Sequence, residues 1–170
     1  MAIIIVNKTE KIVKNKKKLE KVLKVKIKVS GKSVEFSGAA EDEYEGEKVL
    51  EALGMDFSLA DALSIKEKEL EFDTINIKEY SKKKNLTKVK GRLIGKNGKV
   101  LSALAELTKC SLEISGSSVG IIGDPENIKP ALSAIIQIIQ GSKHANVYKG
   151  LEKRKDDPII DWGLKEKKNK

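Results

Sequence analysis

The chain has 170 residues, of which 39% are hydrophobic and 35% are charged, and its formal net charge at pH 7 is +9. That length and the recurring Ile, Val and Leu patterns indicate one or two small globular units with heavily solvated surfaces, rather than a disordered chain. A single cysteine, Cys110, excludes an intrachain disulfide and a cysteine metal cluster, and the single histidine, His144, argues against a histidine metal site, so we expect neither a metal nor a cofactor.

Charge is unevenly distributed along the chain. Residues 8–32 contain eleven lysines and two glutamates, for a net charge of +9, whereas residues 33–80 contain four lysines and fourteen acidic residues, for −10. Residues 81–170 contain nineteen basic and nine acidic residues, for +10. A solvated surface explains any single lysine run, but the basic C-terminal half is the part that we expect to face a polyanion.

The first predicted element is the apolar run at residues 2–6, for which we expect a β-strand. This run is too short for the apolar core of a signal sequence or for a membrane span. We therefore expect a soluble cytoplasmic protein that does not associate with a membrane.

The rest of the N-terminal half alternates between helical and strand-like spacing. A helix, two strands joined by a glycine turn and two further helices are predicted at residues 16–23, 25–29, 34–36, 45–53 and 59–63. Counting back from the strand at residues 25–29 places a turn between helices near residues 10–13, where there is no glycine. Because an acidic turn with side chains cannot admit a phosphate closely, we expect this half to be mainly structural or protein-binding.

The C-terminal half repeats this order of elements. Its strands and helices are predicted at residues 72–77, 86–94, 100–108, 110–115, 119–122, 126–140 and 145–155. Asp124 and Pro125 mark the start of the long helix as N-cap and first residue, and Pro130 should strain or kink its first turn.

Similar order at similar spacing implies two copies of one β-α-α-β-β-α unit, each with an extra C-terminal helix, in an α+β protein. We place the two domains at residues 1–70 and 71–155. A tail at residues 156–170 follows, and Trp162 within it is a candidate for docking on a partner or on the body of the protein.

The most informative stretch is a basic turn bracketed by glycines between two predicted helices, Gly91-Arg92-Leu93-Ile94-Gly95-Lys96-Asn97-Gly98-Lys99. A backbone without side chains at Gly95 and Gly98 can approach another backbone closely, and basic residues favour an anionic one. Lys96 and Lys99 supply mobile positive charge, and Arg92 can fork onto a phosphate. Two glycines separated by two residues between short helices form the clamp with which KH domains hold a single-stranded RNA backbone.

Two further groups of residues are candidates for RNA contact. Apolar residues beside the turn could form a wall for unstacked bases, although core packing explains each of them as well: Leu93, Ile94, Leu101, Leu112 and Ile114. Residues beyond the long helix could extend the RNA track, although a surface helix packed by Val147 and Leu151 is an equal alternative: His144, Tyr148, Lys149, Lys153, Arg154 and Lys155.

A nucleotide-hydrolase loop is the catalytic alternative for the glycine turn. That loop needs four residues between its glycines and a Ser or Thr after the lysine. Here three residues separate Gly91 from Gly95, and Asn97 follows Lys96, so the hydroxyl that would ligate magnesium is missing. We predict no catalytic residues and no enzymatic activity.

Three stretches of the C-terminal half, residues 90–99, 119–124 and 141–149, resemble the second KH domain of archaeal proteins that assemble the small ribosomal subunit. Their eukaryotic counterpart is called the partner of the Nob endonuclease. The Gly-x-x-His-x-x-Val-Tyr pattern at residues 141–148 is specific, because a generic KH domain does not carry it after its final helix. The tandem arrangement extends the resemblance to residues 1–155.

This resemblance implies two type I KH folds and binding near the 3′ end of small-subunit rRNA. It also implies cooperation with a Nob-type endonuclease and association with the alpha subunit of an archaeal initiation factor. The chain departs from the family pattern in the N-terminal half, where relatives generally keep the glycine loop, and in the tail that contains Trp162.

Our hypothesis is therefore a ribosome assembly factor whose second KH domain clamps about four nucleotides of single-stranded RNA. One alternative is a KH-based protein-interaction scaffold. Another is a KH RNA-binding protein outside ribosome assembly, which would normally carry an additional barrel domain that this sequence does not supply.

Overall fold

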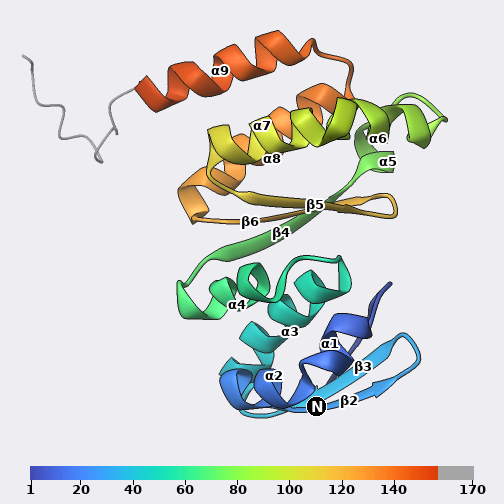
Figure 1. Ribbon diagram of the computed structural model, residues 1–170, viewed down its shortest axis with the longest axis vertical. Helices are drawn as coiled ribbons and strands as arrows, with labels where there is room; N and C mark the ends of the chain where they lie inside the picture. Colours follow the sequence, from blue (N-terminus) through green and yellow to red (C-terminus); the bar gives the residue numbers. More distant parts are fainter. Residues whose placement is uncertain (157–170) are drawn as a thin grey trace, which may run out of the picture.

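The computed structural model describes residues 1–156, and it contains two small antiparallel sheets, each with its own set of helices (Figure 1). The N-terminal half comprises β1 (Ala2–Ile5), α1 (Glu10–Lys14), α2 (Lys16–Leu23), β2 (Lys26–Ser30), β3 (Ser33–Ser37), α3 (Ala40–Gly54) and α4 (Leu59–Glu67). The C-terminal half comprises β4 (Glu71–Asn76), α5 (Ile77–Tyr80), α6 (Leu86–Ile94), the 3-10 turn η1 (Lys96–Gly98), α7 (Lys99–Thr108), β5 (Ser111–Ser115), β6 (Ser118–Gly123), α8 (Pro125–Ile139) and α9 (His144–Asp156).

Helix starts follow local capping chemistry. The side chains of Ser58 and Asn85 accept hydrogen bonds from the first turns of α4 and α6. Asp124 is the N-cap residue of α8 as expected, but its backbone carbonyl rather than its side chain accepts from the first turn. Pro130 lies inside α8, and the helix extends past it to Ile139.

The two halves share one strand order and one register. The sheets run β1-β3-β2 and β4-β6-β5, so the last strand of each sheet lies in its centre. Ile27 pairs with Phe36 in the first sheet, and Leu112 pairs with Ile121 in the second, each 85 positions later. The same shift of 85 relates Lys24 to Lys109, which both end a helix in the left-handed conformation, at φ 57° and 54°.

The expected turn near residues 10–13 is wrong. Residues 10–14 form α1, and the junction between α1 and α2 is the single residue Asn15. The junction is basic rather than acidic, because Lys14 precedes it and residues 16–18 are all lysines. Helix α3 also begins five residues before the expected start. Its first turn is polar, so the sequence shows no repeating spacing of apolar residues there.

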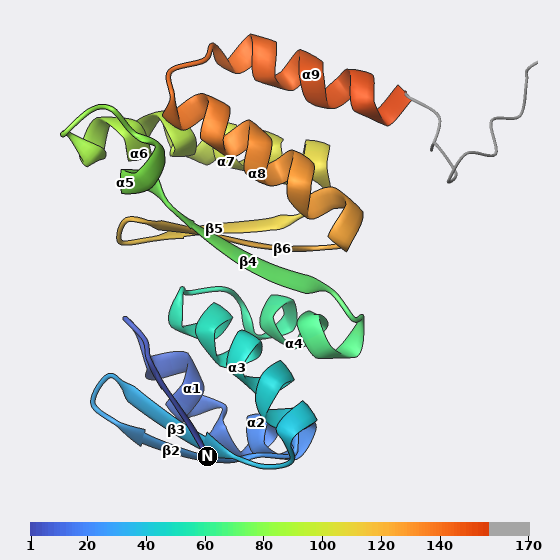
Figure 2. The ribbon, with the colours of Figure 1, turned by 180° about the vertical axis from the view of Figure 1, so that it is seen from behind.

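Each sheet packs one face against the helices of its own half, and the second sheet also packs its other face against the N-terminal half. In the second sheet, Val119 and Ile121 point toward helices α6 to α9 and belong to the C-terminal core. The alternate residue Ile122 points the other way and belongs to the N-terminal core. The second sheet is consequently covered on both faces, and Figure 2 shows it lying between α7 and α8 on one side and α3 and α4 on the other.

The contact between the halves is apolar and closely packed. The rings of Phe57 and Phe72 meet edge to face with centroids 6.1 Å apart. Gly120, in the central strand, lies directly beneath Phe57 and Met55, so that a Cβ at this position would come within 2.7 Å of the Phe57 ring and 3.1 Å of the Met55 sulfur. This close approach requires a residue without a side chain.

Helix length and composition also bear on membrane association. No helix within residues 1–156 is both long and apolar enough to cross a lipid bilayer.

We predict that Gly120→Val lowers the free energy of unfolding by about 1–3 kcal/mol, because the added side chain overpacks the contact with Phe57. Valine otherwise favours strands, so the intrinsic propensity acts in the opposite direction. Chemical denaturation measures the change. Thr74→Val is the matched control, because Thr74 pairs with Gly120 in the sheet and is exposed; an equal effect of both substitutions would contradict the close packing.

Candidate nucleic-acid interface

The turn between α6 and α7 has a backbone that ordinary residues adopt poorly. Gly95 lies at φ 73° and ψ 178°, and Gly98 at φ 75° and ψ 12°. Between them, Asn97 also has a positive φ of 56°. Asparagine is among the few residues with a side chain that tolerate this conformation.

The two glycines are needed for different reasons. A Cβ at Gly95 would collide with the side chain of Val100 and come within 2.9 Å of the Val100 backbone nitrogen, so no side chain fits there. A Cβ at Gly98 would meet nothing within 4 Å, so this position faces open space. A strand of nucleic acid can therefore approach the backbone at Gly98, whereas Gly95 allows α7 to start where it does.

Positive charge surrounds this turn without being neutralised. Lys96 and Lys99 are exposed, and no ion pair is recorded for either within the described residues. Helix α7 begins at Lys99 without a side-chain cap, so its first N–H groups point toward the turn with no partner inside the helix. Together these groups can bind a phosphate oxygen.

Arg92 does not extend this charged surface. Its guanidinium donates to the carbonyl oxygens of Ile138, at 3.0 Å, and Ser142, at 2.7 Å, and so caps the C-terminal end of α8. His144 in turn donates from Nε2 to the carbonyl oxygen of Arg92 at 3.0 Å, which caps the end of α6. We therefore correct the expectation that Arg92 forks onto a phosphate, because both of its terminal nitrogens already donate to carbonyl oxygens inside the protein.

The apolar candidates beside the turn divide into two groups. Leu93 and Leu112 are buried in the C-terminal core, and this corrects their expected place in a groove wall. Ile94 is 38% exposed, and Leu101 and Ile114 are half-buried, so these three can contact a base. The apolar wall is therefore shorter than the sequence predicts.

Helix α9 packs on α7 and α8, as Figure 1 shows at the top of the molecule. Tyr148 is half-buried and stacks on His144 with ring centroids 6.4 Å apart, and burial raises its pKa. Lys149, Lys153 and Arg154 are exposed on the same helix. The side chain of Lys155 and the tail with Trp162 lie outside the described residues.

The N-terminal half has no counterpart of the glycine turn. Six residues separate the buried residues Ile12 and Leu19, whereas ten separate the corresponding pair Leu93 and Leu104. The turn is thus shortened by four residues rather than substituted. The spacing of the apolar residues contains this difference. The prediction of a turn near residues 10–13 misses it, because that prediction assumes the same distance between turn and strand in both halves.

Metal ligands are not clustered anywhere in residues 1–156, where no group of three or more His, Cys, Asp or Glu side chains could hold an ion. The sequence did not mark Val100, in the first turn of α7, as part of this site, because its role becomes visible only through its close approach to Gly95.

We predict that Arg92→Ala lowers the free energy of unfolding by about 2 kcal/mol, because two charge-assisted hydrogen bonds to carbonyl oxygens are lost. Lys88→Ala, an exposed position on the same helix, should leave stability unchanged. Thermal or chemical denaturation measures both. If Arg92→Ala weakened RNA binding while its stability stayed intact, Arg92 would be a phosphate ligand after all.

Comparisons with known proteins agree with this geometry. Residues 71–156 match the family model for the second KH domain of PNO1-type proteins, described as a eukaryotic type, type I KH domain. A KH domain-containing protein of Methanocaldococcus jannaschii is 29% identical over 147 residues, which cover 82% of this chain and 65% of the relative. The pre-rRNA-processing protein PNO1 of Chaetomium thermophilum is 28% identical and is covered over 53% of its length.

The chain therefore spans between about half and two thirds of these relatives. A chain in the crystal structure of an a/eIF2alpha–aDim2p–rRNA complex from Pyrococcus horikoshii superimposes with a TM-score of 0.83 at 26% identity, and the match covers 92% of this chain and 94% of the other. Because the family model covers half of the sequence and includes the glycine turn, this chain belongs to the PNO1 family of KH-domain proteins.

Proposed function

We propose that this protein is a non-catalytic RNA-binding factor in small-subunit ribosome assembly. In this proposal the turn at residues 95–99 clamps a single-stranded segment near the 3′ end of small-subunit rRNA. The observation that carries the proposal is the turn itself, with its bare backbone at Gly98, two exposed lysines and the uncapped start of α7. KH domains hold single-stranded RNA at a glycine turn in this same place, between two short helices.

The remaining contacts of the proposed RNA path come from exposed or half-buried side chains around the turn. Ile94, Leu101 and Ile114 would contact bases on one side. Tyr148, Lys149 and Arg154 on α9 would continue the path, with the lysine and arginine on phosphates. Asn97 would contribute backbone and side-chain hydrogen bonds within the turn.

The names of the relatives support the ribosomal setting. The Chaetomium relative is a pre-rRNA-processing protein, and the Pyrococcus complex contains rRNA together with the alpha subunit of an initiation factor. We propose the same two partners for this chain, and a Nob-type endonuclease as a third. We also propose that residues 1–70 and 71–155 are tandem KH units, since the two sheets share order and register.

The first test is Gly98→Asp, with Gly98→Asn as its matched control. Both side chains tolerate the positive φ of this position and face open space, so both variants should fold. We expect the aspartate to weaken binding of a single-stranded oligonucleotide with the 3′-terminal rRNA sequence by on the order of tenfold or more, because it repels the phosphate, and the asparagine to weaken binding much less. Fluorescence anisotropy measures the affinity, and equal affinity of both variants and the unmodified protein would exclude the clamp.

The second test is the salt dependence of binding. Each phosphate contact on a single strand contributes about 0.7 to the slope of log affinity against log salt concentration. We expect Lys96→Ala to reduce this slope by about 0.7 and Lys88→Ala to leave it unchanged. If the unmodified protein bound no RNA even at low salt, the scaffold alternative would replace the RNA-binding proposal.

A further inference from the structure

The strand β2 forms the open edge of the first sheet, beside α2. Ile27 pairs with Phe36 of β3, yet its backbone N–H points away from β3 and donates to Oε1 of Glu20 at 2.9 Å. Glu20 is half-buried on α2, seven residues earlier. The Glu20 carboxylate therefore accepts the hydrogen bond of the outward-facing N–H of Ile27 at the edge of β2.

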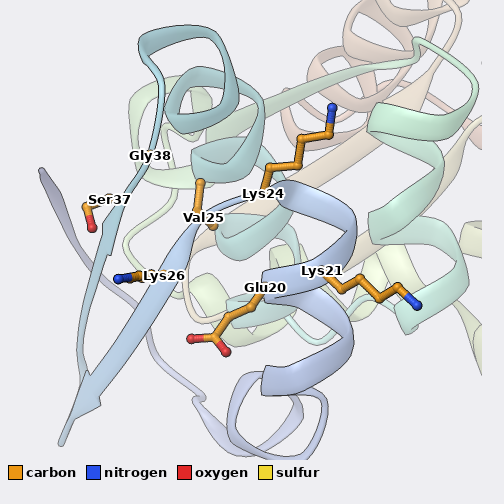
Figure 3. Close-up of a pocket in the computed structure, with 7 residues that line it drawn as sticks. All are labelled: Glu20, Lys21, Lys24, Val25, Lys26, Ser37 and Gly38. Atoms are coloured by element: carbon orange, nitrogen blue, oxygen red, sulfur yellow. The ribbon is translucent and has the colours of Figure 1, made fainter.

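Glu20 lines a hollow between α2 and β2. The hollow has a volume of about 640 Å³ and is lined by Glu20, Lys21, Lys24, Val25, Lys26, Ser37 and Gly38. Figure 3 shows the Glu20 carboxylate reaching from the helix toward the strand, whereas the side chains of Lys21 and Lys26 point away from each other on opposite sides. These two lysines therefore do not converge, and the Glu20 carboxylate is the group that binds the edge of the strand.

The C-terminal half has the same edge without the carboxylate. The shift of 85 residues places Ala105 where Glu20 lies and Leu112 where Ile27 lies, in the same strand register. The N–H of Leu112 must then point toward α7, and no side chain among the described residues is recorded as accepting from it. A methyl group at Ala105 leaves that donor open to the acceptor of a nucleobase.

A second substitution separates the two strand edges. Leu101, which offers an apolar contact for a base in the C-terminal half, corresponds to Lys16 in the N-terminal half. The N-terminal edge thus has neither this apolar contact nor a free donor at Ile27, while the lysines on α2 and β2 are exposed.

We infer, on the basis of the proposed RNA-binding function, that Glu20 blocks the edge of β2 at Ile27 to nucleobases and is a specificity-determining residue of this protein. A carboxylate can only accept hydrogen bonds, so a base that sought the Ile27 N–H would have to displace it. The negative charge also repels the phosphates on either side of such a base. Base selection is thereby confined to the C-terminal half, and the N-terminal lysines attract RNA without regard to sequence.

The test exchanges the residues of the two halves. In a Gly98→Asp background, which disables the C-terminal clamp, we measure the affinities for four single-stranded homopolymer oligonucleotides. Glu20→Ala should introduce a preference for one base of on the order of fivefold, the factor that one hydrogen bond supplies. Glu20→Gln keeps an acceptor for the Ile27 N–H and should introduce none.

The reciprocal substitution is Ala105→Glu with Gly98 intact. It should abolish the base preference of the C-terminal half while the melting temperature stays near that of the unmodified protein. Ser102→Glu adds the same charge at an exposed position of α7 and should retain the base preference. Thermal melting of every variant shows whether it is folded, and if Glu20→Ala does not fold, Ala105→Glu decides.

The two proposals fail in different ways. If Gly98→Asp leaves RNA affinity unchanged, the proposed clamp is wrong. If Gly98→Asp weakens binding but Ala105→Glu keeps the base preference, or a folded Glu20→Ala variant gains none, then Glu20 does not exclude bases and only this inference is overturned.

Discussion

The apolar contact between the second sheet and the N-terminal half is the constraint on which the rest of the structure depends. Gly120 permits it, because only hydrogen at this position lets Phe57 and Met55 reach the central strand. Once this face is covered, the opposite face holds helices α6 to α8 and, between α6 and α7, the glycine turn. One buried contact thus orients the candidate RNA surface without taking part in it.

The C-terminal half supports its turn through capped helix ends. Arg92 caps α8 and His144 caps α6, so the helix that leads into Gly95 is held by the segment that leads into α9. These two reciprocal caps give a physical role to the Gly-x-x-His pattern at residues 141–144, which the sequence marked as specific without explaining it. Rigid supports of this kind keep a backbone surface ready for a ligand before the ligand arrives.

Sequence reasoning predicted most strands and helices and the glycine turn, because these depend on local periodicity and on glycine spacing. It failed where a partner is remote in the chain. The guanidinium of Arg92 bonds a carbonyl 46 residues away, and no local pattern distinguishes that arrangement from a free phosphate ligand. Burial of Leu93 was equally hidden, since a leucine beside a turn fits both a core and a groove. The misplaced turn in the N-terminal half arose because the spacing was transferred from the other half without the deletion.

That deletion makes the difference between the halves hard to reverse. A lost glycine can return by one base change in the gene, but a junction reduced to Asn15 has no backbone in which a clamp could form. A lineage that needed two clamps would have to insert a segment and reshape the start of α2 at the same time. The difference between the two halves is therefore a difference in chain length, and point mutations alone cannot supply the missing turn.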